Sequence, residues 1–272
     1  MIFHCIFSIQ NEDKRILVTA PTNKAVLVLI NRFFDIWNND SRINVVLIGV
    51  EDKLIVSSEE EIGAGDYDIT NDSRLKGIFV YKWLDEMIEN FTEIQNSLDR
   101  KEHNTCLVSK LNFLIQKVEY SIPSCAMGSG FIKCVGSMKT ADEQPHQKDM
   151  CNSLKSLIVC LRNIDATQCM EELLSTANVI FCTLSTCGIS LMKRSKQIDY
   201  LLIDEAAAAT EGECCIPFLL RPKKLLAVGD PKQLPATIIS EYAKDLGLDK
   251  SMHHRLMYEC NMKYIMLDVQ YR

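Results

Sequence analysis

The apolar residues of this chain follow two patterns, one near both ends of the sequence and another in its middle. Near the ends, short runs of apolar and β-branched residues finish on polar or turn-forming residues, which is typical of strands buried on both faces. The predicted strands cover residues 15–19, 44–49, 179–183, 199–203 and 225–228. After the first strand the spacing becomes helical from Lys24, with Val26, Leu29, Ile30 and Phe33 on one face. Strands that alternate with helices predict an α/β fold with a parallel sheet flanked by helices.

The middle of the chain, residues 57–176, has a mainly helical pattern. Residues 57–72 are acidic and predict a loop. Two amphipathic helices follow and together predict a helical hairpin. Their apolar faces are Leu84, Met87, Ile88, Phe91, Ile94 and Leu98, then Leu107, Leu111, Leu114 and Val118. Residues 121–150 have no periodicity and predict a mobile loop. Helix returns near 154–161, and Asp165 with Gln168 predicts the start of another helix, as an acidic variant of a capping box.

Composition narrows the class of protein without naming a function. The 272 residues carry a net charge of −6. This argues against a dedicated nucleic-acid module, although a local groove can be positive on an acidic protein. The twelve cysteines are scattered and form no C-x-x-C pair, which predicts reduced thiols packed as small apolar side chains. Because no apolar run in the sequence has the length of a membrane span, we expect a soluble protein of the cytoplasm or nucleus.

The first candidate for chemistry is the string Tyr-Leu-Leu-Ile-Asp-Glu-Ala at residues 200–206. It places two carboxylates at the carboxyl end of a predicted buried strand, where parallel sheets gather their ligands. Asp204 is suited to hold Mg²⁺, which prefers oxygen ligands and keeps part of its hydration shell. Glu205 is suited to orient and deprotonate an attacking water. A solvated acidic turn would give the same short string, so the pair alone leaves both interpretations open.

A second string, Gly-Asp-Pro-Lys-Gln-Leu-Pro-Ala-Thr at residues 229–237, follows the next predicted strand. Gly229 permits a tight exit from that strand, Pro231 stiffens it, and Gln233 is a neutral side chain able to sense a terminal phosphate. A proline-rich surface turn would explain the glycine and the prolines. It would not explain the whole string, and this favours a functional loop beside Asp204 and Glu205.

Together these strings resemble the motifs of superfamily 1 helicases, in the Upf-like and senataxin-like group that moves 5′ to 3′ on RNA and DNA. Residues 204–207 resemble motif II and residues 229–237 resemble motif III. Residues 20–25 (Ala-Pro-Thr-Asn-Lys-Ala) resemble motif Ia, and residues 179–188 resemble the motif between Ia and II. The last six residues, 267–272, resemble the opening of motif IV. The five blocks occur in the family's order.

The resemblance implies a RecA-like sheet of the P-loop NTPase type and a division of the chain. Residues 1–56 and 177–266 would form the two parts of domain 1A, around a mainly helical insert at 57–176. The insert matches the family only in its position and helical character. Residues 267–272 would lead to a second RecA-like domain. From that end, Arg272 would reach the γ-phosphate across the cleft, with Tyr271 near the base.

The same resemblance implies ATP and Mg²⁺ as cofactors. Asp204 would hold the Mg²⁺ and Glu205 would be the catalytic base. Gln233 would contact the γ-phosphate and couple it to the nucleic-acid groove, while Asp230 would support that loop.

Single-stranded RNA or DNA would be the partner, held through its backbone with little sequence preference. The contacts would come from Pro21, Thr22, Asn23, Thr183 and Ser185. Thr22 and Asn23 also fit the role of helix N-cap, and we expect some capping by Asn23.

The phosphate-binding loop G-x-x-x-x-G-K-[ST] does not occur in these 272 residues. Residues 127–140 come near it, but Met138 rather than glycine precedes Lys139, and the string lies after motif Ia. Residues 2–9 predict a helix, and residues 1–10 resemble the remainder of the helix that follows such a loop in this family, so we expect the chain to start just after it. Two hypotheses follow: part of an ATP-dependent helicase that is inactive alone, or a non-catalytic remnant that binds nucleic acid or protein.

Overall fold

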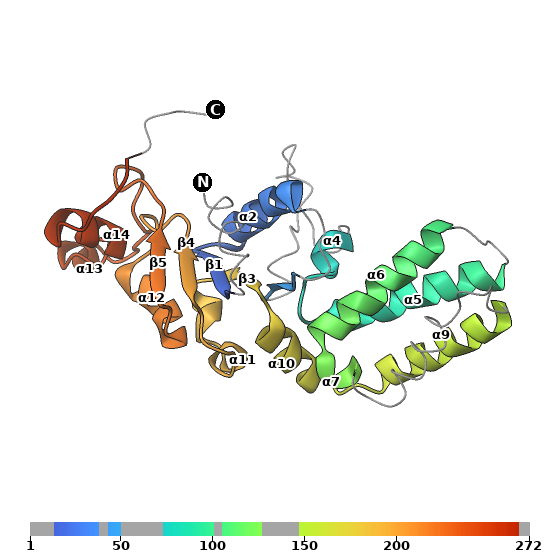
Figure 1. Cartoon of the computed structure of the whole chain (residues 1–272). Helices are drawn as coiled ribbons and strands as arrows, with labels where there is room; N and C mark the ends of the chain where they lie inside the picture. Colours follow the sequence, from blue (N-terminus) through green and yellow to red (C-terminus); the bar gives the residue numbers. More distant parts are fainter. Residues whose placement is uncertain (1–13, 38–42, 50–72, 101–104, 127–146, 267–272) are drawn as a thin grey trace.

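A parallel sheet forms the centre of the computed structural model, which describes residues 14–37, 43–49, 73–100, 105–126 and 147–266. Within these residues the sheet has five strands in the order β2-β3-β1-β4-β5, all parallel (Figure 1). The strands are β1 (Ile16–Ala20), β2 (Val45–Leu47), β3 (Val179–Thr183), β4 (Tyr200–Ile203) and β5 (Lys224–Ala227). The predicted α/β class and the five predicted strands are confirmed. The predicted helix at residues 2–9 lies outside the described residues.

Both faces of the sheet are covered, because successive residues of a strand point to opposite sides. On one face Ile16, Val18 and Phe181 pack against the apolar stripe of α2 (Asn23–Ile36). On the other face Leu17, Ile180 and Leu201 belong to a larger core. Helices α10 (Ala166–Thr176), α11 (Ser190–Lys193) and α12 (Glu211–Cys215) contribute to it. Several cysteines fill these cores as buried thiols, namely Cys151, Cys169, Cys182, Cys187 and Cys214.

Helix α2 starts directly beyond β1, and its N-cap is Thr22. The Thr22 backbone is extended, and its Oγ1 accepts a hydrogen bond from the Ala25 main-chain N–H at 3.2 Å. Asn23 is already the first helical residue, so the expectation that Asn23 caps the helix was wrong. The physical reason is local: only the residue with extended backbone can turn its side chain back onto the free N–H groups.

The helical insert contains α4 (Ser73–Lys76), α5 (Trp83–Asp99), α6 (Thr105–Ser121), α7 (Pro123–Ala126) and α9 (Gln147–Arg162). Helix α5 buries the predicted stripe of Met87, Phe91, Ile94 and Leu98. Helix α9 packs along α5 more extensively than α6 does, so the expected two-helix hairpin is part of a three-helix layer (Figure 1). Helix α7 and the first residues of α9 fall within 121–150, where we expected only loop. Asp165 caps α10 through the Gln168 N–H at 2.8 Å, as predicted.

The insert is attached to the outer edge of β2. Leu47 donates its N–H to the Ile78 carbonyl at 2.7 Å, and Val80 donates to the Leu47 carbonyl at 3.0 Å. This single parallel bridge places residues 78–80 beside β2. It fixes the start of α5 against the sheet.

Shorter helical turns complete the described chain. Two 3₁₀ helices lie between strands in the sequence, η1 (Ser185–Gly188) after β3 and η2 (Ile216–Leu220) before β5. After β5 come α13 (Glu241–Asp245), α14 (Met252–His254) and a π-helical turn, η3 (Arg255–Glu259). Of the helices in the described ranges, none is long and apolar enough to cross a membrane.

The cap of α2 gives the first testable prediction. Thr22→Ala removes the hydroxyl that accepts from Ala25, so we expect a loss of about 1 kcal/mol in the free energy of unfolding. Asn23→Ala is the matched control, because Asn23 lies inside the helix, and we expect it to cost less than half as much. Urea unfolding followed by circular dichroism measures both. Equal losses in the two variants would contradict the assignment of Thr22 as the cap.

Candidate functional site

The predicted site residues gather at the carboxyl edge of the sheet. In the register of the strands Ala20 is paired with Thr183, and Ile203 is paired with both Thr19 and Ala227. Strands β3, β1, β4 and β5 therefore end at the same level. Thr183 is the last residue of β3, and the segments that follow the four strands contain residues 184–185, 21–23, 204–205 and 229–233.

Asp204 is held at the middle of this edge by the backbone of β1. Its main-chain N–H donates to the Thr19 carbonyl at 2.8 Å. Burial raises the pKa of the Asp204 carboxyl, and a hydrogen bond from the Glu205 N–H and the positive charge of Arg32 oppose that rise. A half-buried carboxylate has lost part of its hydration, so a bound cation would stabilise it. This environment fits Mg²⁺.

The described residues offer such an ion no further cluster of protein ligands. Among the residues that the structure describes, no group of three or more His, Cys, Asp or Glu side chains could hold a metal. A Mg²⁺ held by Asp204 would then take water and substrate oxygens as further ligands, as this ion commonly does.

Glu205 has an unusual backbone. Its φ of 52° lies in the left-handed region, which costs a residue with a side chain roughly 1–2 kcal/mol. Main-chain hydrogen bonds of Glu205 and of the residue after it maintain this conformation. The Ala206 N–H donates to the Val228 carbonyl at 2.9 Å, and the Ala208 N–H donates to the Glu205 carbonyl at 3.0 Å. The result is an exposed Glu205 carboxylate directly beside Asp204.

Gly229 lies where β5 passes closest to the segment after β4. The Val228 N–H donates to the Ile203 carbonyl at 2.8 Å, which keeps the two exits together. A Cβ on Gly229 would lie 2.8 Å from the Ala207 main-chain nitrogen. Only glycine therefore permits this approach.

Asp230 shapes the loop that carries Gln233. The Asp230 Oδ1 accepts from the Lys232 N–H at 2.9 Å, and the Asp230 carbonyl accepts from the Gln233 N–H at 3.0 Å. The Gln233 side chain is exposed, with its Nε2 3.5 Å from Asp230 Oδ2. The loop thus turns back on the aspartate and leaves the Gln233 amide facing solvent.

The other half of the edge carries hydroxyl and amide groups. The Leu184 N–H donates to the Ala20 carbonyl at 3.1 Å, so the exits of β3 and β1 are joined. Thr183 Oγ1 lies 2.8 Å from Thr186 Oγ1, while the side chains of Ser185 and Thr22 are exposed. Pro21 and Asn23 are partly exposed between them.

Two predicted site residues cannot be located at this edge of the sheet. Tyr271 and Arg272 lie outside the described residues, and their roles stay predictions.

Sequence reasoning missed a contact beside the Gln233 loop. Arg255 donates through its Nε and Nη2 atoms to both carboxylate oxygens of Glu211, the first residue of α12. That hydrogen bonding lowers the pKa of Glu211. Burial lowers the pKa of His253, and the negative charge of Asp230 opposes that shift. Glu211 and Arg255 are 44 residues apart, and no local pattern signals such a pair.

With this geometry in place, comparison with known proteins identifies the family. A family model described as an AAA domain matches residues 2–241. This chain belongs to that family.

Its relatives make it part of a superfamily 1 helicase of the senataxin-like group, as the resemblance implied. It is 45% identical to "Probable helicase MAGATAMA 3" of Arabidopsis thaliana over 40% of this chain and 13% of that protein. It is 25% identical to "Helicase SEN1" of Saccharomyces cerevisiae over 96% of this chain and 11% of that protein. It is 38% identical to "Probable helicase senataxin" of Homo sapiens over 35% of this chain and 4% of that protein. The helicase region thus spans only a small part of these relatives' length.

Gly229 supplies a stability test of the site. Gly229→Ala places a methyl group against main-chain atoms that cannot move independently, so we expect a loss of about 2 kcal/mol in the free energy of unfolding. Gly212→Ala is the matched control. A Cβ at Gly212 in α12 has no neighbour within 4 Å, and alanine favours a helix by up to about 1 kcal/mol. Denaturant unfolding should show that Gly229→Ala lowers the free energy of unfolding and that Gly212→Ala raises it. A Gly229→Ala variant as stable as the original protein would contradict the close approach at Gly229.

Proposed function

We propose that this helicase region supplies the magnesium and water side of an ATPase site, which in the full-length protein drives translocation along single-stranded RNA or DNA. One observation carries the proposal. The Asp204–Glu205 pair and the Gly229–Gln233 loop are held side by side by main-chain hydrogen bonds between the exits of β4 and β5.

The chemistry divides between the two adjacent carboxylates. Asp204, which is half-buried and has lost part of its hydration, would hold Mg²⁺. The ion, when bound, neutralises charge on the β- and γ-phosphate oxygens. Glu205 is exposed, so its carboxylate can orient the attacking water and take its proton. The left-handed backbone at Glu205 ends the direction of β4 directly after Asp204 and leaves the Glu205 side chain exposed.

The order of the β-strands in the sheet suggests how ATP hydrolysis is coupled to the bound nucleic acid. Asp230 fixes the loop from which Gln233 contacts the γ-phosphate. Strand β1 is next to β4, so the Pro21–Asn23 turn lies beside the nucleotide half of the edge. With Thr183 and Ser185 it contributes hydroxyl and amide groups to the nucleic-acid backbone. Such contacts position a strand and read little sequence, in keeping with either RNA or DNA.

The rest of the site comes from outside the described residues. Arg272 would reach the γ-phosphate and Tyr271 would lie near the base, both at the approach to a second RecA-like domain. A phosphate-binding loop, absent from these 272 residues, would cradle the phosphates. We expect the full-length protein in the cytoplasm or nucleus.

Glu205 gives the direct test. In the full-length protein, Glu205→Gln should lower nucleic-acid-stimulated ATP hydrolysis by roughly 10²-fold or more, since it removes the base and keeps the shape. Binding of ATP should be retained. Glu241→Gln, which changes an exposed glutamate paired with Lys244, is the control and should leave turnover unchanged. Phosphate release and nucleotide binding are the two measurements.

The 272-residue chain by itself should release no appreciable phosphate, because it has no phosphate-loop lysine. Turnover by this chain that disappears in Glu205→Gln would contradict that expectation. Full activity of the Glu205→Gln variant in the long protein would favour the other hypothesis, a region that binds nucleic acid or protein without catalysis.

A further inference from the structure

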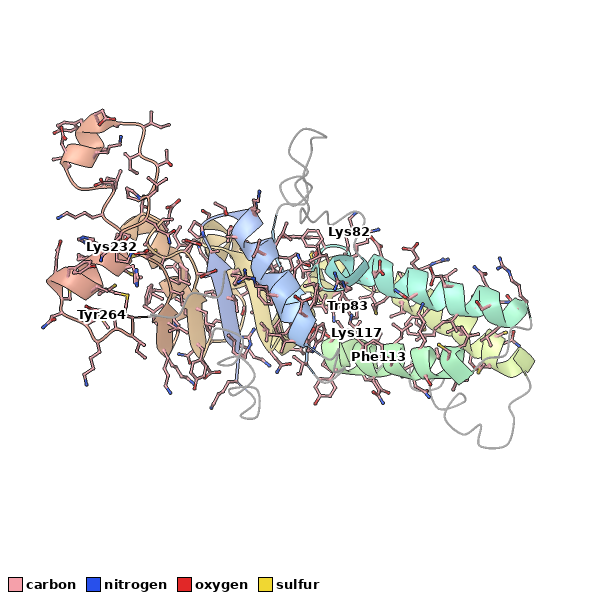
Figure 2. The ribbon with its side chains drawn as sticks, turned by 90° about the horizontal axis from the view of Figure 1, so that it is seen from above. Lys82, Trp83, Phe113, Lys117, Lys232 and Tyr264 are labelled. Carbon is pink, nitrogen blue, oxygen red and sulfur yellow. The ribbon has the colours of Figure 1, made fainter. Side chains whose placement is uncertain are left out.

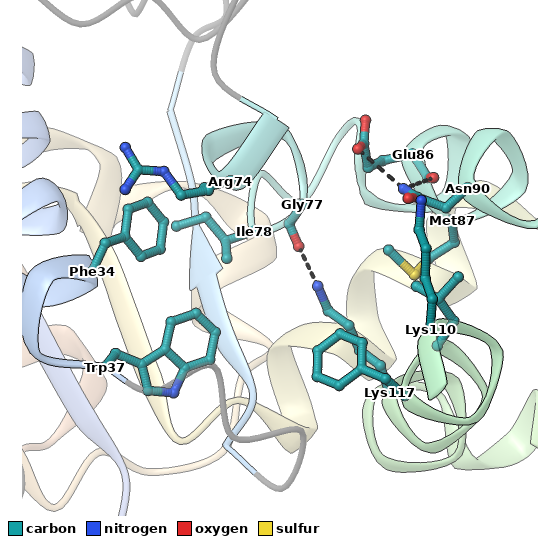
Figure 3. A pocket seen from close by; sticks show the side chains of 12 residues that line it. Phe34, Trp37, Arg74, Gly77, Ile78, Glu86, Met87, Asn90, Lys110 and Lys117 are labelled. Atoms are coloured by element: carbon teal, nitrogen blue, oxygen red, sulfur yellow. Dashed lines mark hydrogen bonds between the residues drawn. The ribbon is translucent and has the colours of Figure 1, made fainter. Parts of the chain in front are cut away.

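A cavity of about 370 Å³ lies where the helical insert meets α2 (Figure 3). Phe34 and Trp37, at the end of α2, form one wall, and Lys110 and Lys117 of α6 lie on the facing wall. Helix α2 starts at the carboxyl edge and runs for 14 residues, so roughly 20 Å separates its two ends. Figure 2 shows Lys117 at the junction of insert and sheet, and Lys232 of the Gln233 loop near the other end of the molecule. The cavity is therefore separate from the site described above.

The charge lining this cavity is mostly positive. Arg74, Lys110 and Lys117 line it, and Glu86 is the one carboxylate among its described lining residues. Glu86 is already engaged, because its Oε1 accepts from the Asn90 side chain at 3.1 Å. Lys110 forms an exposed ion pair with Glu93, which lies outside the lining, at 3.1 Å, and an exposed pair of this kind costs little to displace. The described lining still carries three cations and one carboxylate, which favours an anionic ligand.

Lys117 has the strongest need for such a ligand. Its Nζ donates to the Gly77 carbonyl at 3.1 Å, and among the described residues Lys117 forms no ion pair with a carboxylate. An ammonium group has three donors, so a carbonyl alone satisfies one. Burial lowers the pKa of Lys117 to about 8, opposed by the negative charge of Glu86. A phosphate would supply the missing acceptors and the missing charge.

The opposite wall is suited to a planar group. The rings of Phe34 and Trp37 are stacked, with centroids 6.0 Å apart and an interplanar angle of 22°. The Arg74 guanidinium lies over the Phe34 ring at 5.2 Å. Phe113 adds a third aromatic side chain from α6. Aromatic faces combined with cations are the chemistry by which proteins hold a base and its phosphate.

We propose that this cavity binds a nucleotide carrying one terminal phosphate, with the base along Phe34 and Trp37 and the phosphate at Lys117 and Lys110. The cavity volume is at the lower end of the range for small-molecule sites, which suits a mononucleotide. The ligand is either a free nucleoside monophosphate or the 5′-phosphorylated end of a strand. This proposal uses none of the residues of the proposed ATPase site and stands independently of it.

Titration of the ¹⁵N-labelled 272-residue chain with adenosine monophosphate tests the proposal. The chain has two tryptophans, Trp37 and Trp83, and only Trp37 lines the cavity. We expect a saturable shift of the Trp37 indole signal. Inorganic phosphate and adenosine, each supplying one half of the ligand, should bind at least tenfold more weakly.

Substitutions of single residues test whether adenosine monophosphate binds in this cavity. Lys117→Met keeps an unbranched side chain of similar length and should weaken the affinity for adenosine monophosphate at least tenfold. Lys110→Met, at a more exposed position, should weaken it several-fold without risk to the fold. Lys244→Met removes an equivalent charge far from the cavity and should leave binding unchanged. Asp204→Asn should also leave it unchanged, which separates this site from the ATPase site.

The source of the nucleotide is decided with two single-stranded hexanucleotides. A hexanucleotide with a 5′-phosphate that binds more tightly than adenosine monophosphate, and more tightly than its 5′-hydroxyl counterpart, identifies a strand end. Equal binding of the two hexanucleotides, both weaker than the mononucleotide, identifies a free nucleotide. The proposal is overturned if neither adenosine monophosphate nor the phosphorylated hexanucleotide moves the Trp37 signal, or if binding survives both lysine substitutions.

Discussion

The arrangement of the candidate ATPase site depends on hydrogen bonds that continue the parallel sheet beyond the ends of its strands. Asp204 donates to β1 through Thr19, and Ala206 donates to the exit of β5 through Val228. These bonds keep the strained backbone of Glu205 next to Gly229, where only glycine permits the two segments to approach so closely. The sheet beneath them is locked in register, because a shift by one residue would exchange the two apolar faces. Packing of the core thus determines where the carboxylates lie.

Much of this could be predicted from the sequence. Strands buried on both faces leave apolar runs such as 179–183, and a parallel sheet gathers polar residues at strand ends. The carboxylates of Asp204 and Glu205 were predicted on that basis, together with Gly229 as a tight exit. The left-handed conformation of Glu205 was not predicted, because it follows from contacts on both sides of the turn and not from the residue type.

Other features depend on long-range contacts that no local pattern reveals. Thr22 rather than Asn23 caps α2 because the backbone is already helical at Asn23, so that the helix starts one residue earlier than expected, and the residue types alone do not specify this start. Helix α9 packs on α5 across the segment expected to be loop, and a lack of periodicity did not exclude short helices at its ends. The Arg255–Glu211 pair and the cavity near Lys117 each join elements that are distant in the sequence.

The positive φ of Glu205 sets stability against function at one position. Glycine would relieve the backbone strain there, and asparagine adopts the left-handed region with little penalty. Either change would remove the carboxylate. A laboratory selection of this region for thermal stability alone would therefore drift toward loss of that acid, and variants stabilised by consensus or screening need their residue 205 checked before their activity is compared.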